Sequence, residues 1–176
     1  MSTPEDLRDR NGGRRSPPRR RPPRVLIAGL GNELLRDDGV GVHAARLLAD
    51  DAGGDLRVVA VGTAVLDALH LFEWADRILA IDAMQAGALP GTIYRFGPRD
   101  VLQPLTAASL HELSLVAALR FLSPGCSPAA VTILGVEPAV IDYGLELSPP
   151  VSAALPRLVD VSRHMVRGWR EMRLAG

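Results

Sequence analysis

The sequence predicts an α/β fold in which helices cover both faces of a mostly parallel, five-stranded sheet. Two observations lead to this fold class. Short apolar runs alternate along the chain with longer segments whose apolar residues recur every three or four positions. The chain has 176 residues and no visible internal repeat, which fits one domain. Strands and helices that alternate within one domain are typical of a parallel sheet with helices on both faces.

The expected strands are short and mostly apolar. Four of them are runs bounded by charged or turn-forming residues, and a fifth alternates in a way that indicates an antiparallel edge strand. In chain order, the strands are expected at residues 24–29, 56–61, 78–81, 91–96 (the edge strand) and 131–136.

The expected helices follow from apolar residues at helical spacing. They are predicted at residues 38–50, 63–74, 109–122 and 148–172. The first should bury Leu47, and the second should bury Leu66 and be capped by Thr63. The last should start at Ser148, which precedes two prolines, and Pro156 is expected to kink it.

Composition points to a soluble globular protein in a reducing compartment. The hydrophobic fraction is 47% and the charged fraction is 23%, and Cys126 is the single cysteine, so no internal disulfide can form. No apolar run reaches the roughly 18 to 20 residues that span a bilayer, and no secretory signal is recognisable. We therefore expect a cytoplasmic protein with no membrane partner.

The first 23 residues are expected to form a disordered arm ahead of a single domain at residues 24–176. Residues 1–24 hold eight arginines against Glu5, Asp6 and Asp9, and they are rich in proline and glycine. Contact with RNA, DNA or an acidic protein is the functional alternative. The arm has no aromatic residue on which a base could stack, so no nucleic-acid partner is expected.

Three polar positions qualify for chemistry because ligands bind beyond the carboxyl ends of parallel strands. Asp37 and Asp38 follow the glycine-rich loop after the first strand, and Asp82 directly ends the third. His111 lies at the start of the helix before the last strand. Two carboxylates and an imidazole form a plausible site for a divalent transition metal, with a position left for water or substrate. Asp38, Asp82 and His111 are the predicted ligands.

Each of these residues also has an ordinary structural interpretation. Asp37 is expected to cap the first helix, and Asp38 taken alone could do the same. A single histidine near a helix start, such as His111, is more often structural or exposed. Asp82 is the least ordinary of the set, because a buried charge without a partner is costly.

The remaining candidates are weaker. His43 does not share a helical face with Asp38, and His70 and His164 are expected on solvated faces. The glycine loop after the first strand lacks the third glycine of the dinucleotide fingerprint, where Leu34 stands instead. Cys126 has no histidine near it in sequence and is interpreted as a bystander thiol.

Six motifs occur in order along the chain. The first is the run Val25-Leu-Ile-Ala-Gly-Leu-Gly-Asn-Glu-Leu-Leu-Arg-Asp-Asp-Gly-Val-Gly-Val42. The others are Gly62-Thr63, Ile81-Asp82-Ala83, His111-Glu112-Leu113-Ser114, Leu134-Gly-Val-Glu-Pro138 and Gly144-Leu-Glu-Leu-Ser-Pro149. Together they resemble the nickel-iron hydrogenase maturation proteases over about residues 24–166.

The resemblance implies a three-layer α/β/α sandwich and an aspartic-type endopeptidase. Members of that family remove a C-terminal extension from the hydrogenase large-subunit precursor after nickel has been inserted. Their metal ligands fall on Asp38, Asp82 and His111, which would bind the substrate's nickel rather than a permanent cofactor. The family default is a monomer. Some members have an acid just before the Gly-Thr pair, where this chain has Val61, so a role of that acid in hydrolysis is in doubt here.

Two alternatives stay open at this point. The Leu-Ile-Ala-Gly-Leu-Gly-Asn opening also resembles peptidyl-tRNA hydrolases, although the Pro-Gly and the catalytic histidine that usually follow are absent. The second alternative is a non-catalytic chaperone that only binds a nickel-loaded partner.

Overall fold

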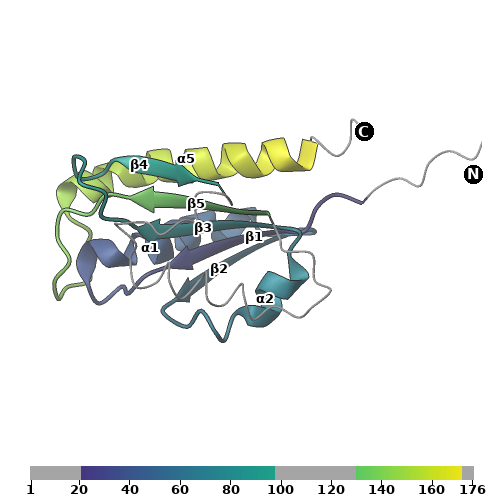
Figure 1. The fold of residues 1–176 in the computed structure, drawn as a ribbon, viewed down its shortest axis with the longest axis horizontal. Coiled ribbons are helices and arrows are strands. Elements are labelled where there is room, and N and C mark those ends of the chain that lie inside the picture. The colour runs from purple at the N-terminus through teal and green to yellow at the C-terminus, as the bar shows by residue number, and fades with distance from the viewer. Residues whose placement is uncertain (1–20, 98–129, 172–176) are drawn as a thin grey trace, which may run out of the picture.

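The computed structural model describes residues 21–97 and 130–171, which form one sheet with helices on both of its faces (Figure 1). The predicted helix at 109–122, with His111, and the loop with Cys126 lie outside the described residues. Residues 1–20 do as well, so the disordered arm stays a prediction.

All five predicted strands are present. They are β1 (Val25–Leu30), β2 (Leu56–Gly62), β3 (Arg77–Ala83), β4 (Ile93–Phe96) and β5 (Ala130–Val136). The sheet has the order β2-β1-β3-β5-β4. Every neighbouring pair is parallel except β4 with β5, which confirms β4 as an antiparallel edge strand.

Two apolar clusters, one on each face of the sheet, make up the core. Alternate residues of β1 and β3 belong to opposite clusters, as the pleat of a strand requires. Helices α1 (Val40–Leu48) and α5 (Pro149–Glu171) pack on the face that carries Ile27. Helix α2 (Leu69–Trp74) packs on the other face through Phe72. The chain therefore forms the predicted three layers.

Glycine lets α1 lie directly on the sheet. A methyl group at Gly41 would lie 2.1 Å from the carbonyl oxygen of Ile81 in β3 and 2.5 Å from that of Leu30 in β1. A methyl group at Gly29 would lie 2.1 Å from the carbonyl oxygen of Gly41. Side chains at these two positions would push the helix away from the strands.

Several details of the predicted helices are wrong. Helix α1 begins at Val40, after a 3-10 turn at Arg36–Gly39, and Leu47 is exposed. Thr63 caps no helix, because residues 63–68 form successive tight turns with hydrogen bonds between positions three apart, and α2 begins at Leu69. Those turns leave Leu66 exposed while Val65 is buried. Helix α5 starts directly after Ser148, as predicted, and continues through Pro156.

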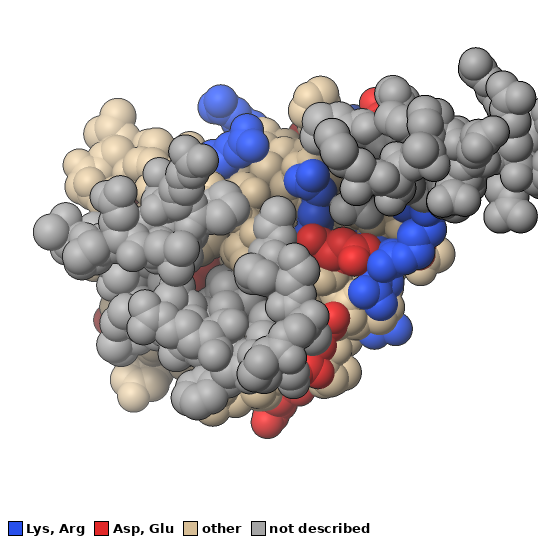
Figure 2. Space-filling view, turned by 45° about the vertical axis from the view of Figure 1, so that its right-hand side comes forward, with Lys and Arg blue, Asp and Glu red and all other residues tan. Residues whose placement is uncertain are grey.

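Charges of both signs lie beside one another on the face drawn in Figure 2. Asp76 binds Arg21 at 2.8 Å and accepts the backbone N–H of Arg24 at 2.7 Å, which fixes the chain just before β1. Within residues 21–97 and 130–171, no helix is both long and apolar enough to cross a bilayer.

Candidate active site

The strand order reverses between β1 and β3, and a crevice for ligands is expected at the carboxyl ends of these two strands. The chain leaves β1 for β2 on one side and then returns to β3 on the other side. In open α/β sheets, such a reversal is where ligands bind, because the connections diverge and leave the strand ends uncovered. The loop after β1 and the end of β3 carry the predicted aspartates.

Asp38 lies in the 3-10 turn that follows the glycine loop of β1. Its side chain is only 6% exposed. The backbone N–H of Asn32 donates a hydrogen bond of 2.7 Å to Asp38 Oδ2. This bond holds the carboxylate against the loop at the end of β1. Asp38 also does not cap α1, whose N-cap is Gly39.

Asp82 is fully buried in β3, one residue from its end. Its Oδ1 accepts the N–H of Ala83 at 2.9 Å. A methyl group at Gly31 would lie 3.3 Å from this Oδ1 and 1.8 Å from the carbonyl oxygen of Asp38. Gly31 also has a φ of +103°, in the region that favours glycine. The backbone of Asp38 and the carboxylate of Asp82 therefore both lie against Gly31, although the two residues are distant in sequence.

The predicted third ligand, His111, lies outside the described residues. Among residues 21–97 and 130–171, no three histidine, cysteine or acidic side chains are grouped closely enough to hold a metal ion. The complete trio thus stays a prediction. The prediction that His70 and His164 lie on solvated faces is confirmed, since both are exposed.

A small groove of about 260 Å³ opens beside the Gly31 loop. Its walls include Asn32, Val61 and Gly62. Val61, the residue just before the Gly-Thr pair, therefore presents an apolar side chain to the groove rather than an acid. Glu33 is the acid of this groove, and its Oε2 pairs with Arg46 Nη2 at 2.5 Å. The groove shares Gly31 with the surroundings of Asp82, but neither Asp38 nor Asp82 lines it.

Asp37 has a structural role that the predicted helix cap did not anticipate. Its Oδ2 accepts the N–H of Ala139 at 2.8 Å, the N–H of Val140 at 2.9 Å and the Ser148 hydroxyl at 2.7 Å. Its Oδ1 accepts the N–H of Ser148 at 2.6 Å. Asp37 therefore joins the 3-10 turn to the loop after β5 and to the start of α5.

The ionised form of Asp37 is favoured despite complete burial. Burial acts to raise the pKa of this carboxyl. The hydrogen bonds from Ser148, Val140 and Ala139 stabilise the charge more strongly and hold the pKa below its usual range.

Glu137 is a further buried carboxylate, and the sequence interpretation missed it. It accepts the Tyr94 hydroxyl at 2.6 Å and the N–H groups of Ala86 and Gly87 at 2.8 and 3.2 Å. Burial acts to raise the pKa of Glu137, but these hydrogen bonds outweigh it and lower the pKa. Burial of the Tyr94 hydroxyl, together with its hydrogen bond to Glu137, raises the pKa of Tyr94. An acid directly after a buried strand was the signal that singled out Asp82, and it applies equally to Glu137.

Known proteins share both the sequence pattern and the fold. The family model described as hydrogenase maturation protease matches residues 42–163, a range that includes Asp82 and His111. The hydrogenase expression/formation protein HupD of Rhodobacter capsulatus is 29% identical over 157 residues, which cover 85% of this chain and 74% of HupD.

Two solved structures superimpose on most of the chain. The [NiFe] hydrogenase maturation protease HybD from Thermococcus kodakarensis has a TM-score of 0.72 and 30% identity, covering 81% of this chain and 99% of that one. The hydrogenase maturating endopeptidase HybD from E. coli has a TM-score of 0.73 and 25% identity, covering 82% and 93%. Since the family model spans more than half of the sequence, this chain belongs to the hydrogenase maturation proteases and is a peptidase of that family.

Proposed function

We propose that this protein removes the C-terminal extension of a nickel-loaded [NiFe] hydrogenase large-subunit precursor, and that Asp38, Asp82 and His111 bind the nickel of that substrate. The proposal rests on the position of these residues around the loop after β1, where the Asp38 carboxylate accepts the N–H of Asn32 and Asp82 Oδ1 lies beside Gly31. Two carboxylates of low solvent exposure near the same end of the sheet favour a divalent cation, because its positive charge counters their like charges.

Nickel belongs to the substrate in this proposal, and the protease needs no resident cofactor. Carboxylate and imidazole ligands suit nickel, with the imidazole supplied by His111. A precursor that carries nickel then binds more tightly than one that lacks it. Each factor of ten in that selection needs about 1.4 kcal/mol of differential binding.

Hydrolysis requires a water to attack the carbonyl carbon of the scissile peptide bond. In our proposal, the nickel ion or one of the aspartates activates this water. The C–O bond forms, the C–N bond breaks, and the proton released by the water passes to the leaving amine. A carboxylate that carries this proton would account for an aspartic-type classification.

The surroundings of the crevice suit a folded protein substrate. Leu34, Tyr143 and Leu145 are 57%, 86% and 64% exposed, respectively. The N–H of Gly144 donates to the carbonyl oxygen of Leu34 at 3.0 Å, so these apolar side chains lie on adjoining loops. Exposed apolar side chains that cluster beside a site are typical of a protein contact surface.

Cleavage of purified precursor, followed by mass spectrometry, tests the proposal. Asp38→Asn, Asp82→Asn and His111→Ala should each lower the cleavage rate about a hundredfold or more, because each removes a ligand. Asp50→Asn, at an exposed acid near the end of α1, is the matched control and should cleave normally. Precursor without nickel should stay intact.

Two results would contradict the proposal. Normal cleavage by a folded Asp38→Asn or His111→Ala variant would refute the ligand assignment. Tight binding of the nickel-loaded precursor by the wild-type protein without release of a fragment would favour the non-catalytic chaperone instead. Family membership already argues against the peptidyl-tRNA hydrolase alternative.

A further inference from the structure

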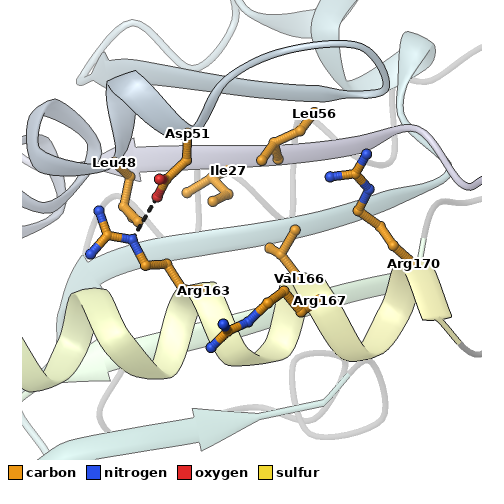
Figure 3. Close-up of a pocket in the computed structure, with 8 residues that line it drawn as sticks. All are labelled: Ile27, Leu48, Asp51, Leu56, Arg163, Val166, Arg167 and Arg170. Carbon is orange, nitrogen blue, oxygen red and sulfur yellow. Dashed lines mark hydrogen bonds and ion pairs between the residues drawn. The ribbon is translucent and has the colours of Figure 1, made fainter.

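A second groove lies between α5, the end of α1 and the start of β2 (Figure 3). Its volume is about 230 Å³, below the roughly 300–1,000 Å³ of pockets that enclose drug-sized ligands. The apolar side chains of Ile27, Leu48, Leu56 and Val166 line it. An apolar groove of this size suits one or two side chains of a peptide better than a whole small molecule.

Three arginines of α5 surround this apolar surface. Arg163, Arg167 and Arg170 are spaced by four and three residues, so they lie along one side of the helix. Arg163 is paired, with its Nε 2.7 Å from Asp51 Oδ2, the dashed contact in Figure 3. Arg167 and Arg170 are exposed and make no hydrogen bond or ion pair within the described part of the chain.

The row of arginines has the length of a short extended peptide. At 1.5 Å per residue, Arg163 and Arg170 are about 10 Å apart along the helix axis. An extended chain covers that distance in about three residues. Arg167 and Arg170 are about 4.5 Å apart along the axis, and their long side chains can spread further. Carboxylates two residues apart in an extended peptide, at about 7 Å, could therefore reach both while the apolar side chain between them covers Ile27 and Leu56. Asp51 would repel a carboxylate placed at Arg163, which directs an anion toward the two unpaired arginines.

We propose that this groove binds an acidic segment of another protein, with an apolar side chain seated between α5 and the sheet. The charge complementarity of Arg167 and Arg170 and the small apolar groove beside them define this ligand class. The groove involves none of the residues proposed for cleavage, and the inference does not depend on nickel or on hydrolysis.

Fluorescence anisotropy with a fluorescein-labelled Glu-Glu-Leu-Glu-Glu peptide tests this site on the full-length protein. The double variant Arg167→Gln/Arg170→Gln should weaken binding about tenfold, the range for two exposed ion pairs. Arg95→Gln/Arg157→Gln makes the same change in net charge at two exposed arginines outside the groove, and it should bind within about twofold of wild type. A peptide with asparagine in place of leucine should bind about tenfold more weakly.

Three outcomes would overturn the inference. Equal affinity of the wild-type protein and the Arg167→Gln/Arg170→Gln variant would show that the groove does not bind the peptide. Equal losses of peptide affinity in both double variants would indicate only a general attraction between the acidic peptide and the positive charges of the protein. Equal affinity for the leucine and asparagine peptides would show that the arginines bind the carboxylates but that the apolar groove does not bind a side chain. Unchanged circular dichroism spectra would establish that the variants are folded.

Discussion

The buried carboxylates of this protein differ in whether their hydrogen bonds join distant segments of the chain or nearby residues. Asp37 accepts four hydrogen bonds from residues more than a hundred positions away along the chain. Glu137 likewise connects the loop after β3 to Tyr94 of β4. By contrast, Asp38 and Asp82 accept N–H groups from their own neighbourhood. Asp37 and Glu137 hold distant segments together at the same end of the sheet as the proposed site.

Asp37→Asn should therefore destabilise the fold by about 3 kcal/mol, even though the side chain keeps its shape. An amide group cannot accept at its nitrogen, so at least one buried donor from Ala139, Val140 or Ser148 loses its partner. Urea denaturation at neutral pH measures the loss. Asp142→Asn, at an exposed acid of the same loop, is the control and should change stability by less than about 0.5 kcal/mol. A loss below about 1 kcal/mol for Asp37→Asn would mean that these bonds contribute little.

At the scale of elements, the close packing of α1 against β1 and β3 determines where Asp38 lies. The helix touches the strands through the backbone at Gly29 and Gly41. The 3-10 turn that carries Asp38 leads directly into this helix. A shift of α1 away from the sheet would therefore move Asp38 relative to Asp82.

Gly41→Ala should destabilise the protein by more than about 3 kcal/mol, since its methyl group would collide with backbone oxygens that cannot move independently. Gly168→Ala provides the opposite case, because nothing lies within 4 Å of a methyl group there on α5. That control should stabilise the protein by about 0.5–1 kcal/mol through the better helix propensity of alanine. Thermal unfolding measures both, and a Gly41→Ala variant as stable as wild type would show that α1 is free to shift.

At the scale of the whole molecule, three carboxylates make stability depend on pH. Burial acts to raise the pKa values of Asp37, Asp76 and Glu137, but hydrogen bonds outweigh burial and lower all three. For Asp76, the arginines at 21 and 24 supply those bonds. A lowered pKa in the folded state means that the unfolded chain takes up protons first as the solution is acidified.

The free energy of unfolding should therefore be insensitive to these three groups above pH of about 5. It should fall as the pH drops through the ordinary values of 4.5 for Glu and 3.8 for Asp. Urea denaturation between about pH 3 and 7 measures the slope, which should be shallower in Asp37→Asn. Stability that rises on acidification would contradict the sign of these pKa shifts.

The sequence was sufficient for the sheet but not for the contacts between loops. Apolar runs predicted four of the strands and an alternating pattern predicted β4 as the edge strand, because burial on a sheet requires those residues locally. Asp82 was predicted at a strand end for the same reason. The partners of Asp37 come from residues 139–148, and no local pattern indicates a hydrogen bond across that separation. Thr63 and Leu66 were misplaced because tight turns replace the first part of the expected helix.

The course of α5 determines from which side the protein can be tethered. This helix starts beside Asp37 and runs back to the amino ends of the strands, where Trp169 lies 5.4 Å from the guanidinium carbon of Arg77 at the start of β3. Arg21 is held by Asp76 just before the same strand. The first and last described residues thus lie at the opposite end of the sheet from Asp38 and Asp82 (Figure 1). A resin or a fused domain joined near either of them would leave the crevice facing solution and open to a bulky precursor.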